Sequence, residues 1–132
     1  MIRGIGTDIV DLSRIRRLLD RFGEAFENKC FTEKERNKAR QSADPAASYA
    51  KRFAAKEAVL KTIGTGMRQG LGWHDISIEN DQLGKPVVHL SGGVADYIRE
   101  SLNIETGFRF HISLSDEGDL ALAFSVLEMI DH

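Results

Sequence analysis

The hydrophobic pattern of the first 26 residues changes from that of a strand to that of a helix. Residues 2–10 are rich in Ile, Val and Thr, and Gly4 and Gly6 alternate with bulky residues, which predicts a strand that another segment approaches closely. Apolar residues then recur every three or four positions, which predicts one helix over 12–26 with a single buried face. These positions are Leu12, Ile15, Leu19, Phe22 and Phe26.

Two helix start signals follow in the middle of the chain. Thr32 with Glu35 forms a capping box, which predicts a short helix from Glu33 to about Gln41. Asp44 followed by a proline repeats the signal, and Ala, Lys, Glu and Leu dominate the residues after it. The sequence therefore predicts a central helix over 45–63, the longest element of the chain.

Alternating apolar positions mark strands in the C-terminal half. Residues 75–80 and 87–90 form one predicted hairpin, and 108–114 and 120–127 form another. Ser91 can cap a helix between the hairpins. This order of elements indicates an α+β fold over 1–132, a single domain whose mainly antiparallel sheet packs on the long central helix.

Composition narrows the class of protein. The chain has 132 residues, enough for one domain with a real core. Its formal charge of -2 and pI near 6.1 argue against nucleic acid as the main partner. Cys30 is the only cysteine, so no intrachain disulfide can form and a reducing cytoplasm is the expected location. The chain has no apolar run that could span a membrane and no apolar N-terminal leader.

Glu57 is the unusual residue of the predicted central helix. Its neighbours one turn away are Phe53 and Ala54 on one side and Leu60 and Lys61 on the other. The simple interpretation is an exposed ion pair between Glu57 and Lys61, worth about 0.2–0.5 kcal/mol. The apolar surroundings favour a second interpretation, in which the carboxylate has a partner, a metal ion or a raised pKa.

The predicted helix over 12–26 also has a positively charged face. Arg14, Arg17 and Arg21 share this face with Leu18, and Arg16 adds a charge nearby. Such a stripe is usually solvated surface. A face of one sign with an apolar residue inside it would also suit an acidic amphipathic helix of a partner protein.

Asp8 has two open interpretations near the end of the first strand. It can cap the following helix, a role that Asp11 or Ser13 would fill equally well. Alternatively, Asp8 and Glu57 together can hold Mg²⁺, which typically takes one or two carboxylates, waters and substrate phosphates. Lys61, one turn beyond Glu57, would then reach the same phosphate. Physical reasoning alone gives only a hypothesis of metal-assisted phosphate chemistry.

Three motifs resemble those of the bacterial holo-acyl-carrier-protein synthases, which are phosphopantetheinyl transferases. They are the stretch 4–10 (GIGTDIV), the stretch 51–66 from KRFAAKEA to the glycines Gly64 and Gly66, and the stretch 83–86 (LGKP). Their order is that of the family, and they span most of the chain. A fourth stretch, 111–116, is similar to the family's third motif, although many members have histidine where Asp116 stands, so Asp116 is assigned no role.

The resemblance implies an activity and a set of roles. The enzyme would transfer phosphopantetheine from coenzyme A to a serine of apo acyl carrier protein, releasing adenosine 3′,5′-bisphosphate. Asp8 and Glu57 would hold Mg²⁺, and Lys61 would stabilise or protonate the leaving phosphate. Three bases for the serine stay open: Glu57, Asp8 and a water on the metal. The coenzyme site would comprise Arg52, Gly64, Gly66, Lys85, Pro86 and His111.

The resemblance also implies an assembly and a partner surface. Members of the family form trimers with sites between neighbouring subunits, so a homotrimer is expected. Arg14, Arg17, Leu18 and Arg21 resemble the surface that docks the acidic carrier protein. Two competing hypotheses remain: a non-catalytic adaptor that uses this basic surface and has a structural Glu57, and a different Mg²⁺-dependent enzyme acting on a nucleotide diphosphate.

Overall fold

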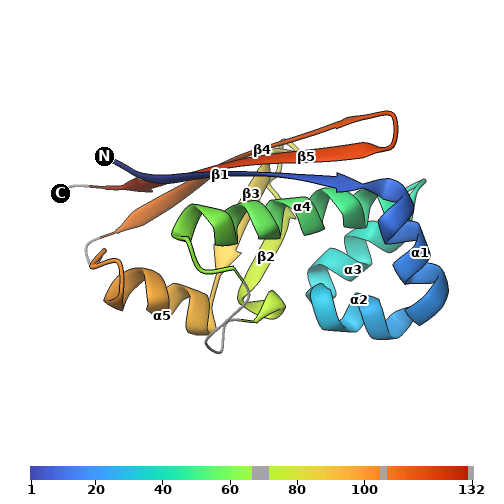
Figure 1. The fold of residues 1–132 in the computed structure, drawn as a ribbon, viewed down its shortest axis with the longest axis horizontal. Helices are drawn as coiled ribbons and strands as arrows, with labels where there is room; N and C mark the ends of the chain where they lie inside the picture. The colour runs from blue at the N-terminus through green and yellow to red at the C-terminus, as the bar shows by residue number, and fades with distance from the viewer. Residues whose placement is uncertain (67–71, 105–106, 131–132) are drawn as a thin grey trace.

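Three antiparallel strands cover one side of the central helix. The structure is a computed structural model that describes residues 1–66, 72–104 and 107–130. Its main sheet has the order β1 (Ile2–Asp11), β5 (Leu120–Met129) and β4 (Phe108–Glu117). Helix α4 (Pro45–Ile63) runs beneath this sheet (Figure 1). The predicted α+β fold, with an antiparallel sheet on a long helix, is confirmed.

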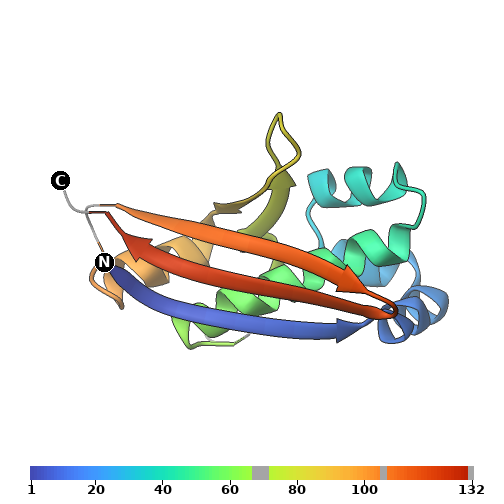
Figure 2. The same ribbon diagram turned by 90° about the horizontal axis from the view of Figure 1, so that it is seen from above.

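The smaller elements surround α4 on its remaining sides. Figure 1 shows α1 (Leu12–Phe22), α2 (Glu24–Cys30) and α3 (Glu33–Arg40) near one end of α4 and α5 (Gly92–Glu100) near the other. A short 3₁₀ helix η1 (Trp73–Asp75) leads into the two-stranded hairpin of β2 (Ile76–Asn80) and β3 (Pro86–Leu90). Figure 2 shows the tip of this hairpin projecting beyond the edge of the main sheet. No helix in the described residues is long and apolar enough to cross a membrane.

Helix α4 has the bounds that its signals predict. The Asp44 side chain accepts a hydrogen bond from Ala47 N at 3.3 Å at one end, and Gly64 adopts φ 80° at the other. The helix is buried on almost every side, because the main sheet, α1, α3 and β2 all pack against it. Its alanines allow these neighbours to approach closely.

Strand β1 lies unusually close to α4. A Cβ atom added to Gly4 would lie 2.4 Å from Thr62 O, and one added to Gly6 would lie 2.4 Å from Ala58 O. Real Cβ atoms do not approach oxygen so closely, so only glycine fits at these two positions. The prediction that another segment approaches this strand is confirmed, and that segment is α4.

The single helix predicted over 12–26 is wrong. The chain forms α1 (Leu12–Phe22) and α2 (Glu24–Cys30), with a corner at Gly23, where φ is 53°. A left-handed residue ends a helix readily, and the new direction lets Phe26 and Cys30 reach the core. Helix α3 (Glu33–Arg40) follows with the predicted capping box of Thr32 and Glu35.

Candidate active site

Asp8 faces α4 from the inner side of β1. It is 9% exposed, and Lys61 Nζ donates a hydrogen bond to its Oδ1 at 2.9 Å. The same ammonium donates to Thr7 O at 3.1 Å. Asp11 caps α1 by accepting from Ser13 N at 2.8 Å, so the capping role considered for Asp8 belongs to Asp11.

Glu57 lies half-buried beside this ion pair. Burial raises the pKa of its carboxyl group, the negative charge of Asp8 raises it further, and Arg14 and Lys61 oppose both effects. Within the described ranges no group donates a hydrogen bond to the Glu57 carboxylate, and Lys61 pairs with Asp8 rather than with Glu57. The exposed Glu57–Lys61 pair considered from the sequence is therefore not the arrangement found.

The two carboxylates fit a hard divalent cation. Both Glu57 oxygens lack protein donors in the described part of the chain, and Asp8 lies near enough to raise the pKa of Glu57. A bound cation would relieve this repulsion between like charges. The described residues contain no cluster of three His, Cys, Asp or Glu side chains of the kind a zinc site requires. A pair of carboxylates, completed by waters and substrate phosphate oxygens, is the donor set that Mg²⁺ typically takes.

Arg52 lies on another face of α4 from Glu57. Its guanidinium is buried and donates to Ser48 Oγ at 2.8 Å and to Asn80 Oδ1 at 2.9 Å. Its Nε is buried without a partner among the described residues. A cavity of about 160 Å³ next to it is also lined by Pro86, so Arg52 belongs with the β2–β3 hairpin and not with Asp8.

Lys85, Pro86 and His111 line one cleft of about 670 Å³ between β3, β4 and α5. His111 is on the edge strand β4, with its Nε2 2.9 Å from Glu128 Oε1, and that contact lowers the pKa of Glu128. Asp8 is on the opposite edge strand, β1, and faces inward. Within one chain, the cleft residues expected to bind the coenzyme therefore lie apart from the carboxylates Asp8 and Glu57.

Gly64 and Gly66 follow Lys61 at the C-terminal end of α4. Both have positive φ, 80° and 60°, a backbone conformation that favours glycine. They turn the chain after the helix. In position they belong with the carboxylate site and not with the cleft that contains His111.

Of the four arginines on or beside the basic face, Arg16 alone forms an ion pair within the described residues. Arg14 lies over the Phe53 ring at 5.5 Å and Arg21 over the Phe22 ring at 5.2 Å, while Arg17 makes only a 3.4 Å contact with Ser13. Arg16 instead pairs with Asp44 at 2.8 Å, so its charge is matched. Arg16 does carry a charge beside the basic face, as expected, but Asp44 neutralises much of it.

An apolar groove, called here the docking groove, lies beside this face. Its volume is about 340 Å³, and its main lining residues are Leu18, Phe22, Phe26, Cys30, Phe53 and Trp73. Leu18 is half-buried in its wall. The sequence placed Leu18 within the basic face but gave no sign that Phe53 and Trp73, 20 residues apart, stack at 5.1 Å to form part of the groove.

Lys56 and Glu35 form a buried ion pair that the sequence reasoning missed. Both side chains are fully buried, and Lys56 Nζ lies 2.6 Å from Glu35 Oε1. The absence of a polar face on α4 was the available signal. It indicated that some charged residue of the helix must be buried, but Lys56 is the most buried of them and Glu57 is only partly so.

The outer face of the main sheet is largely apolar and exposed. Thr7 pairs with Phe124 and Ile9 with Leu122 across β1 and β5, so the outward side chains of the two strands lie side by side. The exposed apolar residues there are Ile2, Ile5, Ile9, Leu120, Leu122 and Phe124. A contiguous apolar patch of this kind is typical of a protein interface.

Comparison with known proteins places this geometry in a family. The sequence profile described as the 4'-phosphopantetheinyl transferase superfamily matches residues 4–125. The holo-[acyl-carrier-protein] synthase of Brucella ovis is 42% identical over 130 residues, covering 98% of this chain and 97% of that protein.

Solved structures of holo-[acyl-carrier-protein] synthases also match the fold of this chain. The crystal structure of holo-[acyl-carrier-protein] synthase from Neisseria meningitidis matches with TM-score 0.85 and 44% identity, covering 97% of this chain and 99% of that one. The Bacillus anthracis synthase, in complex with CoA (3',5'-ADP), matches with TM-score 0.78 and 36% identity over 98% and 99% of the two chains. The chain belongs to the 4'-phosphopantetheinyl transferase superfamily.

Proposed function

We propose that this protein transfers the 4'-phosphopantetheine arm of coenzyme A to a serine hydroxyl of an apo acyl carrier protein. The reaction requires Mg²⁺ and releases adenosine 3',5'-bisphosphate. The observation that carries this proposal is the meeting of Asp8, Glu57 and Lys61 from β1 and α4. The names of the relatives from Brucella ovis and Neisseria meningitidis support the same reaction.

Each residue of the carboxylate site has a defined task in this proposal. Asp8 and Glu57 hold Mg²⁺, which when bound offsets the negative charge that develops on the pyrophosphate. Lys61 supplies the positive charge that faces the leaving phosphate, and its hydrogen bond to Asp8 fixes the direction of its flexible stem. That hydrogen bond also raises the pKa of Lys61, so the ammonium stays charged.

The coenzyme residues form a second group that we assign to the nucleotide end of coenzyme A. Arg52, whose buried Nε has no partner among the described residues, and Lys85 are candidates for phosphate contacts, while Pro86 and His111 shape the cleft. Gly64 and Gly66 lie apart from this group, where their positive φ turns the chain after Lys61. Because one chain keeps the two groups apart, a complete site would combine residues of two neighbouring copies.

We propose a homotrimer, which the family resemblance implies, in a reducing cytoplasm, which the single cysteine favours. The apolar outer face of β1 and β5 would be covered in such an assembly, which explains why residues such as Ile5 and Ile9 are more than 60% exposed in the single chain. Covering this face would also bring the His111 strand of one copy toward the Asp8 strand of the next.

The carrier protein would dock on α1. Arg14, Arg17 and Arg21 present positive charge to an acidic helix, and the docking groove offers a place for an apolar side chain of that helix. Arg14 also influences the pKa of Glu57, so the docking face borders the carboxylate site. This position would bring the carrier serine to the phosphate that is attacked.

One assay tests the function. The protein is incubated with coenzyme A, Mg²⁺ and an apo acyl carrier protein, and mass spectrometry measures the carrier. One added phosphopantetheine per carrier, lost when EDTA removes Mg²⁺, is the expected result. Absence of the adduct with several carriers would favour the adaptor hypothesis, and coenzyme A cleavage without transfer would favour the other Mg²⁺-dependent enzyme.

A further inference from the structure

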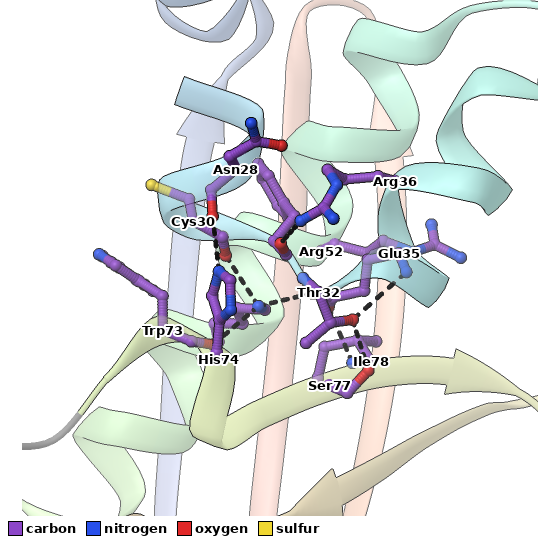
Figure 3. A network of polar contacts seen from close by, with 12 residues as sticks. Asn28, Cys30, Thr32, Glu35, Arg36, Arg52, Trp73, His74, Ser77 and Ile78 are labelled. Atoms are coloured by element: carbon purple, nitrogen blue, oxygen red, sulfur yellow. Dashed lines mark hydrogen bonds and ion pairs between the residues drawn. The ribbon is translucent and has the colours of Figure 1, made fainter. Parts of the chain in front are cut away.

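The three donors of the Lys56 ammonium bind three separate segments beneath the docking groove. Lys56 Nζ lies 2.6 Å from Glu35 Oε1 on α3, and it donates to the carbonyl oxygens of Cys30 at 2.8 Å and Trp73 at 2.9 Å. Figure 3 labels the three residues that supply these acceptors. An ammonium has three N–H donors, so all three are used. Lys56 therefore joins the end of α2, the start of α3 and η1 to the central helix.

Two of these acceptors belong to residues that line the docking groove. Cys30 is on the α2 wall and Trp73 is on the η1 wall. The Trp73 ring stacks on Phe53 at 5.1 Å, and the guanidinium of Arg14, a residue of the basic face, lies over the same Phe53 ring. The Lys56 ammonium thus sets the separation of two groove walls and the position of the aromatic pair between them.

Glu35 gives this arrangement its rigidity. Its Oε1 also accepts from Thr32 N at 2.8 Å, and its Oε2 accepts from Ile78 N at 2.8 Å. The carboxylate is therefore fixed by the α3 cap and by β2 before it meets Lys56. The ammonium is held in one place, so its hydrogen bonds fix the positions of the carbonyl oxygens of Cys30 and Trp73.

Stability alone does not explain a buried lysine at this position. Replacement of a buried ion pair by apolar side chains of similar volume is often neutral or stabilising. An apolar side chain cannot, however, hold two carbonyl groups at fixed positions. What Lys56 adds is geometric: it fixes the backbone of both groove walls.

We propose that Lys56 is a positioning residue for recognition of the carrier protein, because it fixes the width of the docking groove. This inference rests on the proposed function, in which the groove receives an apolar side chain of the carrier helix. Lys56 touches neither the carrier nor coenzyme A, and it acts through the backbone of Cys30 and Trp73.

A second contact joins the same two walls and supplies an independent variant. His74 Nε2 donates to Asn28 O at 2.6 Å, which ties η1 to α2 at the surface. His74 is exposed, so His74→Ala should fold normally. If groove width controls recognition, loss of this contact should act in the same direction as loss of Lys56, with a smaller effect.

The test compares the wild-type protein with the double variant in which Lys56→Met and Glu35→Gln remove both charges of the buried pair. The KM for apo carrier protein should rise at least about tenfold, as when an apolar pocket loses its fit, while the KM for coenzyme A and for Mg²⁺ stays within about twofold. Trp73 is the only tryptophan, so its fluorescence should change as its ring leaves Phe53.

The control is Ile98→Ala, which removes a fully buried side chain from α5, away from the groove. It should lower the unfolding temperature without changing the KM for carrier protein relative to that for coenzyme A. An equal rise in carrier KM in this control, or an unchanged carrier KM in the double variant, would overturn the inference.

His74→Ala decides the question if the double variant does not fold: a rise in carrier KM of about twofold to fivefold supports the inference, and an unchanged value overturns it. A wild-type protein that transfers no phosphopantetheine would instead refute the proposed function. The two failures are therefore distinguishable.

Discussion

Replacing Gly6 with alanine should disable the carboxylate site by moving a strand. The new Cβ atom would lie 2.4 Å from Ala58 O, 2.6 Å from Thr62 Oγ1 and 2.8 Å from Thr62 N. Two of these three atoms belong to the backbone of α4, so rotation of a side chain cannot relieve the clash. Strand β1 must move away from the helix by about 1 Å to reach ordinary contact at 3.4 Å.

This displacement acts directly on Asp8, two residues further along the same strand. Its 2.9 Å hydrogen bond from Lys61 would lengthen beyond hydrogen-bonding distance, and its separation from Glu57 would grow. Overpacking of this kind costs roughly 1–3 kcal/mol of folding free energy. A misplacement of about 1 Å at reacting groups can reduce the rate by about a hundredfold.

The measurement combines thermal unfolding with the initial rate of phosphopantetheine transfer as Mg²⁺ is varied. Gly6→Ala should fold, unfold at a lower temperature and require much more Mg²⁺ for any remaining activity. Gly72→Ala is a matched control, because Gly72 has φ -115° and an added Cβ would lie 3.8 Å from Asp75, an ordinary contact. Wild-type stability and Mg²⁺ dependence in Gly6→Ala would refute the argument that the close approach of β1 positions Asp8.

Further predictions follow from the same site, the basic face and the sheet. Glu57→Gln should reduce transfer by about a hundredfold or more, yet it should raise the unfolding temperature at neutral pH. The reason is that burial and Asp8 raise the pKa of Glu57, so the wild-type protein loses stability as pH rises through that raised pKa and the glutamine variant does not. A lower unfolding temperature in calorimetry without Mg²⁺ would contradict this. Arg21→Glu should raise the KM for carrier protein by roughly tenfold and make it less dependent on salt, with the KM for coenzyme A unchanged. Arg16→Ala should leave the KM for carrier protein and the KM for coenzyme A nearly unchanged in the same steady-state assay, because Arg16 pairs with Asp44. If Arg21→Glu and Arg16→Ala had equal effects, the assignment of the basic face to carrier docking would be refuted. Phe124→Asp should convert the assembly to single chains in light scattering, and an unchanged mass would exclude the outer face of the sheet as the interface.

Most of the fold could be predicted from the sequence because helix caps and strand patterns are local signals. The cap at Asp44, the left-handed glycine after Lys61 and the alternation of apolar residues in the strands act within a few residues of themselves. The same locality explains the error at Gly23: the apolar period continues to Phe26, and only the packing of Phe26 and Cys30 against the core shows that the chain turns there.

The sequence by itself determined the motifs and, through them, the family, together with the residue types needed for Mg²⁺ and phosphate. Only the tertiary structure decided which residues meet: Lys61 pairs with Asp8 rather than with Glu57, and Lys56, which is more deeply buried than Glu57, pairs with Glu35. These pairings join residues more than 20 positions apart. Their partners are set by how closely strand and helix pack, a distance that no local pattern in the sequence specifies.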